Sequence, residues 1–221
     1  MKDRKTSDEI WVVKFDEEAA QNFRDSMIDA SRGDPTRPIV VYIDSFGGQV
    51  DSLAKMIETM DEVPNPIITV AMGKAMSCGA ILLSHGDYRL CGRHSRVMIH
   101  EVSAATAGDV HDMHADATEG KRLNRHFMGL LAKNCGIDGG YDELRKIIKS
   151  RDGRDFYLDA NDALKFGIVD SIGLPRIESM LAHNVSLTPP KKVVHKKTTQ
   201  KSESIKQKQK KGARGGKSIK A

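Results

Sequence analysis

Short runs of consecutive apolar residues alternate along the chain with stretches in which apolar residues recur every three or four positions. The short runs predict strands buried in a sheet, at residues 10–15, 39–43, 67–72, 88–91, 97–100 and 168–172. The periodic stretches predict helices, at residues 16–30, 50–60, 77–84, 109–133, 138–150 and 161–166. Strands that alternate with helices predict an α/β architecture with right-handed crossover connections.

Residues at the predicted boundaries agree with this division. Asp16 stands where the N-cap of the first helix belongs, and Gly167 follows the last helix. Pro64 and Pro66 break the chain between the second helix and the strand that follows it.

The predicted helix over residues 109–133 differs from the others because it is long and highly charged. We predict that it projects from the body of the domain and buries its apolar stripe only against a partner subunit. The chain is therefore expected to form a homo-oligomer. The residues of the stripe are Met113, Ala117, Leu123, Phe127, Leu130 and Leu131.

Charge divides the chain into two parts of opposite sign. The net charge is +5, but residues 191–221 contain 12 lysines and arginines and a single acidic residue. The remaining chain has 23 basic and 29 acidic residues. The composition of the tail cannot bury enough apolar surface to fold. We predict a folded domain over residues 1–185 and a disordered basic tail over residues 186–221.

The basic tail has two interpretations. It is either a solvated extension without a specific role or a polycation that contacts nucleic acid nonspecifically. No aromatic residue lies among its basic residues to stack on bases, so sequence-selective binding is not expected.

Composition also bears on compartment and cofactors. The longest apolar stretches, residues 66–72 and 80–83, are far shorter than the roughly 20 residues that span a bilayer. Residues 1–5 lack the apolar run of a signal peptide. The three cysteines have no metal-ligand spacing, and their odd number favours reduced thiols. We expect a cytoplasmic protein that contacts no membrane and uses no metal or cofactor.

Two predicted strands are followed by corners of small residues. Residues 44–48 read Asp-Ser-Phe-Gly-Gly, and adjacent glycines let backbone N–H groups turn outward. Such groups can bind a phosphate, cap a helix or stabilise an oxyanion, and a tight turn is the alternative. No Lys-Ser or Lys-Thr pair follows, so this corner is not a P-loop.

The second corner, residues 73–79, holds Ser77 at the start of a predicted helix. A serine among small neighbours at a strand-to-helix turn is open to substrate, as in a nucleophile elbow, although the Gly-x-Ser-x-Gly spacing is absent. The alternative is that Ser77 only caps the helix. The segment by itself favours neither interpretation.

A nucleophilic serine needs a base, and His100 is the best candidate because it ends an apolar strand that can hold an imidazole in place. His85 follows Ser77 on the same predicted helix and should point elsewhere. A carboxylate would orient the imidazole, and Asp152 and Asp155 both lie in a predicted loop between helices. The residues alone do not decide between them. Solvated positions are expected for the histidines of the charged helix, His111, His114 and His126.

Four segments resemble, in the same order, those of the proteolytic subunit of the Clp protease, a family of self-compartmentalised serine peptidases. Residues 44–48 look like its Ser-Pro-Gly-Gly turn, and residues 72–80 look like its nucleophile segment. Residues 95–100 are similar to its histidine strand, and residues 154–172 are similar to its aspartate segment and closing strand. The resemblance runs from about residue 10 to residue 172.

The resemblance implies a crotonase-like α/β core with a handle helix, and it implies hydrolysis of peptide bonds by a serine endopeptidase. It makes Ser77 the nucleophile and His100 the general base that then acts as the acid. It makes Asp155 the orienting carboxylate, because that residue falls at the family's Arg-Asp-aromatic position.

The same resemblance assigns the oxyanion hole to the backbone N–H groups of Gly48 and Cys78, with Gly47 in the same substrate-binding turn. The family has proline at the position of Phe46, so we expect an altered substrate-binding edge. Cys78 follows the serine where the family usually has methionine or another apolar residue. Its thiol is expected to be a small core side chain and not a second nucleophile.

Assembly and partners are implied as well. Family members form two seven-membered rings that enclose a chamber where unfolded polypeptide is cut, and the helix over residues 109–133 would interdigitate the rings. Arg151 and Arg154 would then be ring-to-ring ion-pair partners, with simple solvation as the alternative. Fewer residues precede Ile10 than in the family, whose N-terminal segment contacts an ATP-dependent unfoldase. The sequence therefore argues against such a partner.

Three alternatives stay open at this point. A short N-terminal segment and a basic tail also suit a virus-encoded capsid-maturation protease that acts without an unfoldase. A non-catalytic ring subunit is the second alternative, although all three triad residue types are present. An acyl-CoA hydratase or isomerase of the same fold is the third, and Glu101 beside His100 would be its nearest candidate for a catalytic glutamate.

Overall fold

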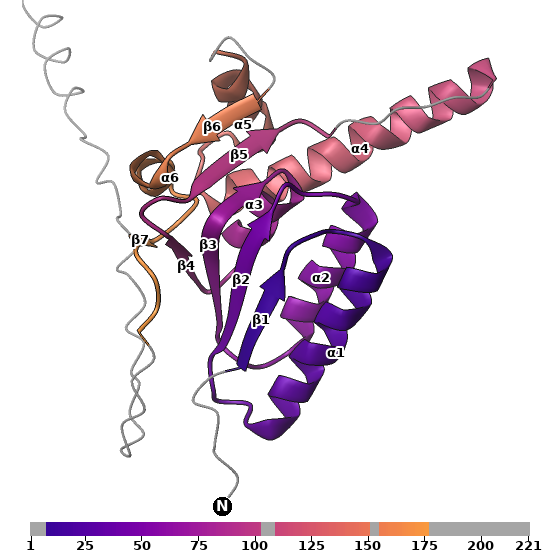
Figure 1. Ribbon diagram of the computed structural model, residues 1–221. Coiled ribbons are helices and arrows are strands. Elements are labelled where there is room, and N and C mark those ends of the chain that lie inside the picture. Colours follow the sequence, from indigo (N-terminus) through magenta and orange to yellow (C-terminus); the bar gives the residue numbers. More distant parts are fainter. Residues whose placement is uncertain (1–7, 103–108, 151–154, 177–221) are drawn as a thin grey trace, which may run out of the picture. The chain divides into compact units, whose positions relative to one another are not determined.

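The computed structural model describes residues 8–102, 109–150 and 155–176, and Figure 1 shows how their elements are arranged. The strands are β1 (Asp8–Val12), β2 (Ile39–Ser45), β3 (Ile67–Met76), β4 (Tyr88–Cys91), β5 (Arg96–His100), β6 (Asp155–Leu158) and β7 (Ser171–Ile172). The helices are α1 (Glu17–Gly33), α2 (Val50–Glu62), α3 (Cys78–Ser84), α4 (Val110–Asn134), α5 (Gly140–Lys149) and α6 (Ala160–Phe166). The predicted tail, its nucleic-acid contact and the domain boundary at residue 185 lie outside the described residues.

The strands form a mostly parallel sheet in which β1, β2, β3, β4 and β7 lie side by side. The central strand, β3, has two successive neighbours on one edge, because residues 68–71 pair with β4 and residues 74–76 pair with β5. β6 adds to β5 in the antiparallel direction. This sheet confirms the predicted α/β class.

β3 ends at Met76 and not at residue 72, where the apolar run led us to end it. The extra residues include Gly73 and Lys74, which apolar patterning does not mark as strand. The backbone of residues 74–76 nevertheless pairs with β5, since a ladder needs N–H and C=O groups and not apolar side chains. The longer strand carries the chain directly to Ser77.

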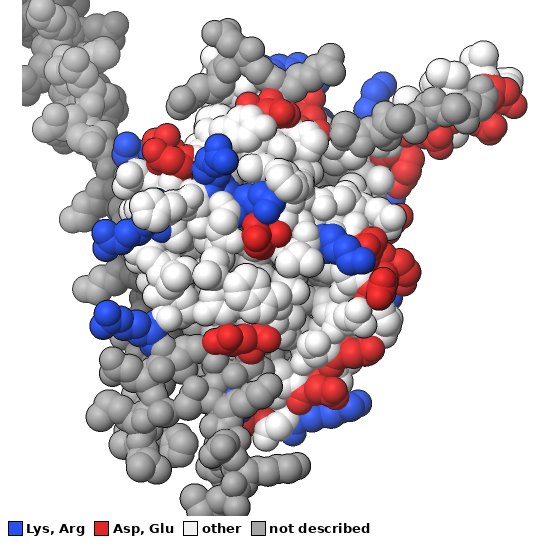
Figure 2. Space-filling model, viewed as in Figure 1, with Lys and Arg blue, Asp and Glu red and all other residues white. Residues whose placement is uncertain are grey.

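Helices α1, α2 and α3 pack on one face of the sheet (Figure 1), where their apolar residues join those of β2 and β3 in the main core. The alternate residues of the strands make a second apolar cluster on the opposite face, and Trp11 stacks on Tyr42 there with ring centroids 4.8 Å apart. Figure 2 shows mostly uncharged side chains over β1, β2 and β3. The members of this second cluster are Val40, Tyr42, Val70 and Leu90.

The two halves of α4 differ in their surroundings. Its first turns extend away from the sheet (Figure 1), and Val110 and Met113 are exposed there. Its second half packs inside the domain, where Phe127 and Leu131 are buried with Leu144 of α5. The prediction that the whole stripe is buried only against a partner subunit is therefore wrong, since α5 and the main core cover the second half. No described helix is both long and apolar enough to cross a bilayer.

Two strands near the end of the described chain differ from prediction. β6 was predicted as loop, yet Phe156 and Leu158 are buried while Asp155 and Tyr157 are exposed, which is strand alternation. Four residues carry too short a pattern to be recognised in the sequence. β7 contains only Ser171–Ile172 of the predicted range 168–172, and Ile168 and Val169 before it are buried outside any strand.

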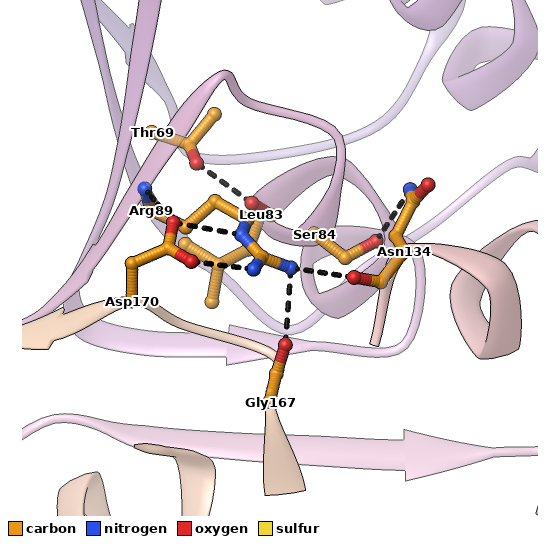
Figure 3. Close-up of polar contacts among 7 residues, drawn as sticks. All are labelled: Thr69, Leu83, Ser84, Arg89, Asn134, Gly167 and Asp170. Atoms are coloured by element: carbon orange, nitrogen blue, oxygen red, sulfur yellow. Dashed lines mark hydrogen bonds and ion pairs between the residues drawn. The ribbon is translucent and has the colours of Figure 1, made fainter. Parts of the chain in front are cut away.

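A single arginine joins four parts of this fold (Figure 3). Arg89 of β4 makes two hydrogen bonds to the Asp170 carboxylate, from Nε at 3.0 Å and from Nη2 at 2.6 Å. Its Nη1 donates to the carbonyl oxygens of Asn134, at the end of α4, and of Gly167, after α6. Both members of the ion pair are about 15% exposed, so solvent screens them weakly. Arg89 thus holds two helix ends against the sheet.

Candidate active site

Ser77 occupies the corner between β3 and α3. Its backbone has φ 55° and ψ −119°, and it is the one non-glycine residue with positive φ among the described residues. Such a conformation costs of order 1–3 kcal/mol and is kept only where the surroundings impose it. Here the Ser77 N–H donates to the Met98 carbonyl of β5 at 2.8 Å, and its own carbonyl accepts from the Ala80 N–H at 3.0 Å. These two backbone hydrogen bonds hold the strained corner in place.

The Ser77 hydroxyl makes no capping hydrogen bond to α3, although Ser77 stands at the N-cap position. Its Oγ lies instead 2.7 Å from Nε2 of His100, at the end of β5. A neutral imidazole with its proton on Nδ1 accepts the hydroxyl proton in this arrangement. The geometry favours the nucleophile interpretation of Ser77 over the capping one.

His100 and Asp155 are a cross-strand pair of β5 and β6. Nδ1 of His100 lies 3.9 Å from Oδ1 of Asp155, which is within ion-pair range and longer than a hydrogen bond. The Asp155 side chain is 45% exposed. Of the two aspartates left open by the residue pattern, Asp155 lies beside the imidazole, and Asp152 lies outside the described residues, as do Arg151 and Arg154.

The glycine corner after β2 is pressed against Ser77. A Cβ placed on Gly47 would lie 2.7 Å from Cβ of Ser77, and one placed on Gly48 would lie 2.3 Å from the Phe15 carbonyl oxygen. Both glycines have positive φ, of 103° and 154°. Only residues without a side chain fit at these two positions. The close approach brings the backbone of this corner beside the serine.

Two backbone N–H groups of these corners donate to no backbone carbonyl among the described residues. Cys78 is the first residue of α3, so its N–H has no acceptor within the helix. The N–H of Gly48 donates to no backbone carbonyl among the described residues. The Gly48 carbonyl accepts a hydrogen bond from Sγ of Cys78 at 3.3 Å, and this contact links the two corners.

Burial raises the pKa of the Cys78 thiol, and hydrogen bonding with the Gly48 backbone and with the Ser77 side chain opposes that rise. A buried thiol with a raised pKa stays protonated near neutral pH and is a poor nucleophile. All three cysteines are free thiols, as the sequence predicted. Cys78 is thus a core side chain with a donor role toward Gly48.

Phe46 is the residue that stands where the resemblance places proline, and its ring is 73% exposed. The ammonium group of Lys74 lies 4.5 Å from the centroid of that ring. The same ammonium lies 2.5 Å from Oδ1 of Asp44. Lys74 therefore contacts both Asp44 and the exposed ring of Phe46 beside the glycine corner.

His85 and the three histidines of α4 lie where they were predicted. Nε2 of His85 lies 2.8 Å from Oδ1 of Asp61, so its ring points away from Ser77. The three histidines of α4 are exposed: His111, His114 and His126. Among residues 8–102, 109–150 and 155–176 no group of three or more metal-ligating side chains converges.

The structure also places polar residues near His100 that the sequence did not single out. The buried amide of Asn124 and the exposed guanidinium of Arg145 bond to the two residues that follow His100 in the chain. The sequence offered one indication of this contact, which is that Asn124 is a polar residue beside the apolar stripe of the predicted helix. Its partner could not be identified without the fold.

An α/β fold with a parallel sheet, and a serine at a strand-to-helix corner beside an imidazole, define a serine hydrolase. The family model described as Clp protease matches residues 8–176. The chain belongs to the Clp protease family and is a serine-type endopeptidase. The family assignment confirms both the predicted resemblance and the predicted fold.

Curated relatives with this similarity include several actinobacterial proteins. ATP-dependent Clp protease proteolytic subunit 3 of Rhodococcus jostii is 35% identical over 161 residues, which cover 72% of this chain and 77% of the relative. The protein of the same name from Nocardia farcinica is 34% identical, with 72% of each chain covered. Proteolytic subunit 1 of R. jostii is 33% identical, with 72% and 71% covered.

Proposed function

We propose that this chain hydrolyses peptide bonds with Ser77 as nucleophile, His100 as general base and acid, and Asp155 as the orienting carboxylate. The observation that carries the proposal is the 2.7 Å contact between Ser77 Oγ and His100 Nε2 at a strained corner. Backbone strain of this kind clusters at functional sites. The proposal needs no group that the chain does not itself supply.

The reaction follows from the roles of these atoms. Ser77 Oγ attacks the carbonyl carbon of the scissile bond while its proton passes to Nε2 of His100. The imidazolium then gives that proton to the leaving amine, which departs and leaves an acyl-enzyme. Water, deprotonated by His100, hydrolyses the acyl-enzyme and restores the serine.

The negative oxygen of each tetrahedral intermediate would be bound by the N–H groups of Gly48 and Cys78. One of these N–H groups begins a helix, and the other has no backbone acceptor among the described residues. Each such donor is typically worth about 2.7–4 kcal/mol of transition-state stabilisation. The thiol contact between Cys78 and the Gly48 carbonyl supports a fixed spacing of the two donors.

The 3.9 Å separation of His100 and Asp155 is compatible with the proposed role of the carboxylate. Catalytic hydrogen bonds are often long before substrate binds and shorten in the reacting complex. At 3.9 Å the carboxylate lies on the Nδ1 side of the imidazole, which is the side that the proposed role requires. Closure of the gap would add a direct hydrogen bond to Nδ1.

Labelling with a fluorophosphonate probe tests the assignment. The wild-type chain and the matched control Ser150→Ala should both react, because the Ser150 hydroxyl lies outside the site and donates to the Ile147 carbonyl. Ser77→Ala should not react, and His100→Ala should react far more slowly. Equal labelling of the wild type and Ser77→Ala would contradict the proposed nucleophile. Acyl-CoA turnover that survives Ser77→Ala would favour a hydratase or isomerase instead.

We further propose that the chain works as a homo-oligomeric ring, a pair of seven-membered rings by family resemblance, whose chamber holds polypeptide substrates. Large apolar side chains support this because Val110, Met113, Trp11 and Phe46 are between 46% and 81% exposed. Such surfaces in a single chain favour contact with another subunit. Light scattering at micromolar concentration and negative-stain imaging test it, and a monomer would contradict it.

An ATPase partner is the last part of the proposal. The similar curated proteins are named ATP-dependent, which supports such a partner and weighs against the expectation drawn from the N-terminal residues. A labelled unfolded protein should then be degraded faster when a Clp-type ATPase and ATP are added. Cleavage that no ATPase stimulates would favour the capsid-maturation alternative. Assembled rings without peptidase activity under any condition would favour a non-catalytic subunit.

A further inference from the structure

The chain that follows His100 is held by side chains from two helices. β5 ends at His100, so Glu101 and Val102 have no strand partner. The Val102 N–H donates instead to Oδ1 of Asn124 on α4, at 3.0 Å. Nε of Arg145 on α5 donates to Oε1 of Glu101 at 2.7 Å. Both residues directly beyond the imidazole are therefore fixed from outside the sheet.

Asn124 is an unusual residue for its position because it is only 9% exposed and lies among apolar neighbours of α4 such as Phe127. Both ends of its amide are bonded, since Nδ2 donates to the Tyr141 hydroxyl at 3.1 Å. The guanidinium of Arg125 lies 4.8 Å from the centroid of the Tyr141 ring. A flipped amide would set its NH₂ group against the Val102 N–H, two donors facing each other, whereas the Tyr141 hydroxyl can bond to either end, so the Val102 N–H is what holds Oδ1 in place.

We infer that Asn124 is a positioning residue for His100 that acts through the backbone of Val102. The inference rests on the proposed role of His100 as the base. A proton transfer over the 2.7 Å from Ser77 to His100 tolerates displacements of about 0.5 Å. Without the Asn124 bond, the exposed ion pair between Arg145 and Glu101 is the remaining described support of this segment, and the end of β5 shifts more easily.

The two supports are unequal. The Asn124 side chain is buried and its bond to Val102 is partly buried, whereas the side chains of Arg145 and Glu101 are 45% and 37% exposed, and exposed ion pairs contribute little. Asn124 is therefore the principal support. Because Asn124 belongs to α4, whose first turns are exposed, a displacement of that helix would reach His100 by this route.

Asn124→Leu tests the inference because it removes both amide bonds at similar volume. Active sites are counted by titration with the fluorophosphonate, and kcat for a fluorogenic peptide is expressed per titrated site. We expect this kcat to fall about tenfold, because a small misplacement of a catalytic group lowers the rate strongly. KM should change by less than about twofold, because no substrate contact is removed. The matched control is Asn134→Leu on the same helix, whose amide donates to the Ser84 hydroxyl and touches no part of β5. It should leave kcat per titrated site unchanged.

A conservative variant separates positioning from packing. Asn124→Asp keeps the oxygen that accepts from Val102 and should recover most of the lost kcat. If Asn124→Leu does not fold, Tyr141→Phe takes its place, because it releases the Asn124 amide while keeping the ring, and kcat should fall about threefold. Wild-type kcat per titrated site in whichever variant folds would overturn the inference. A wild-type chain that neither reacts with the probe nor turns over peptide would contradict the proposed function instead.

Discussion

His100 and Asp155 face each other as partners across the antiparallel strands β5 and β6, with Nδ1 3.9 Å from Oδ1. Backbone register alone brings this carboxylate to the imidazole, because residues directly opposite in a ladder have Cβ atoms about 4.5–5.5 Å apart. The Asp155 side chain is 45% exposed, so water screens its charge. Strand register thus aligns the two residues, but their side chains are too far apart for a hydrogen bond.

Asp155→Asn should lower kcat by on the order of 10- to 100-fold, which is less than the roughly 10⁴-fold loss at a fully buried triad aspartate. The smaller effect is expected because the charge is partly screened. Peptidase assays with a fluorogenic peptide measure it, and Asp138→Asn on the exposed surface is the control. Unchanged kcat in Asp155→Asn would remove this residue from the mechanism.

Gly47→Ala should abolish probe labelling, because its Cβ would lie 2.7 Å from Cβ of Ser77. The positive φ of 103° adds a backbone cost of about 1–3 kcal/mol. The control is Gly129→Ala within α4, where a Cβ meets nothing within 4 Å and helix propensity should add about 0.5–1 kcal/mol. Urea unfolding measures both stabilities. Normal labelling of Gly47→Ala would show that this corner does not approach Ser77 as described.

Arg89→Met should destabilise the folded chain by about 3–5 kcal/mol, because it leaves the Asp170 carboxylate buried without its cation. The carbonyls of Asn134 and Gly167 lose a donor in the same variant. Arg122→Met is the control, since its ion pair with Glu119 is exposed on α4. Equal unfolding midpoints in urea for the two variants would contradict the role assigned to Arg89.

The free energy of unfolding should fall at alkaline pH through two shielded thiols, those of the buried Cys91 and the half-buried Cys135. Burial raises the pKa of Cys135 to about 12 and that of Cys91 to about 11. An unfolded thiol ionises near 8.5, so above that pH the unfolded chain releases protons that the folded chain keeps. This contribution to stability is complete below pH about 8.5 and is lost as the pH rises toward the folded values.

The free energy of unfolding falls by about 1.4 kcal/mol per pH unit for each thiol, in the pH range where the thiol is ionised only in the unfolded chain. Urea unfolding between pH about 8 and 10.5 measures this slope. The free energy of unfolding of Cys135→Ala should decline less steeply with pH than that of the wild type. The difference in slope should equal the contribution of one thiol. Parallel declines in the two proteins would show that Cys135 ionises as readily when folded as when unfolded.

Sequence patterns located most of the elements because burial leaves a period of two or of 3.6 along the chain. The pattern failed where packing, and not periodicity, decides the structure. The second half of α4 looked like an external stripe, yet Phe127 and Leu131 meet α5 inside the domain. β6 is too short to show a period, and its partner β5 lies far away in the sequence.

Residue patterns were enough to predict the α/β class, the two glycine-rich corners and the candidates Ser77 and His100, because these depend on local chemistry. The direction of the side chains came from the fold, in which Ser77 points at His100 and not along its helix, and Asp155 lies across from the imidazole. The structure also revealed the bond from Asn124 to Val102. Contacts of this kind join residues on different elements, and distances between elements are fixed by packing and strand register.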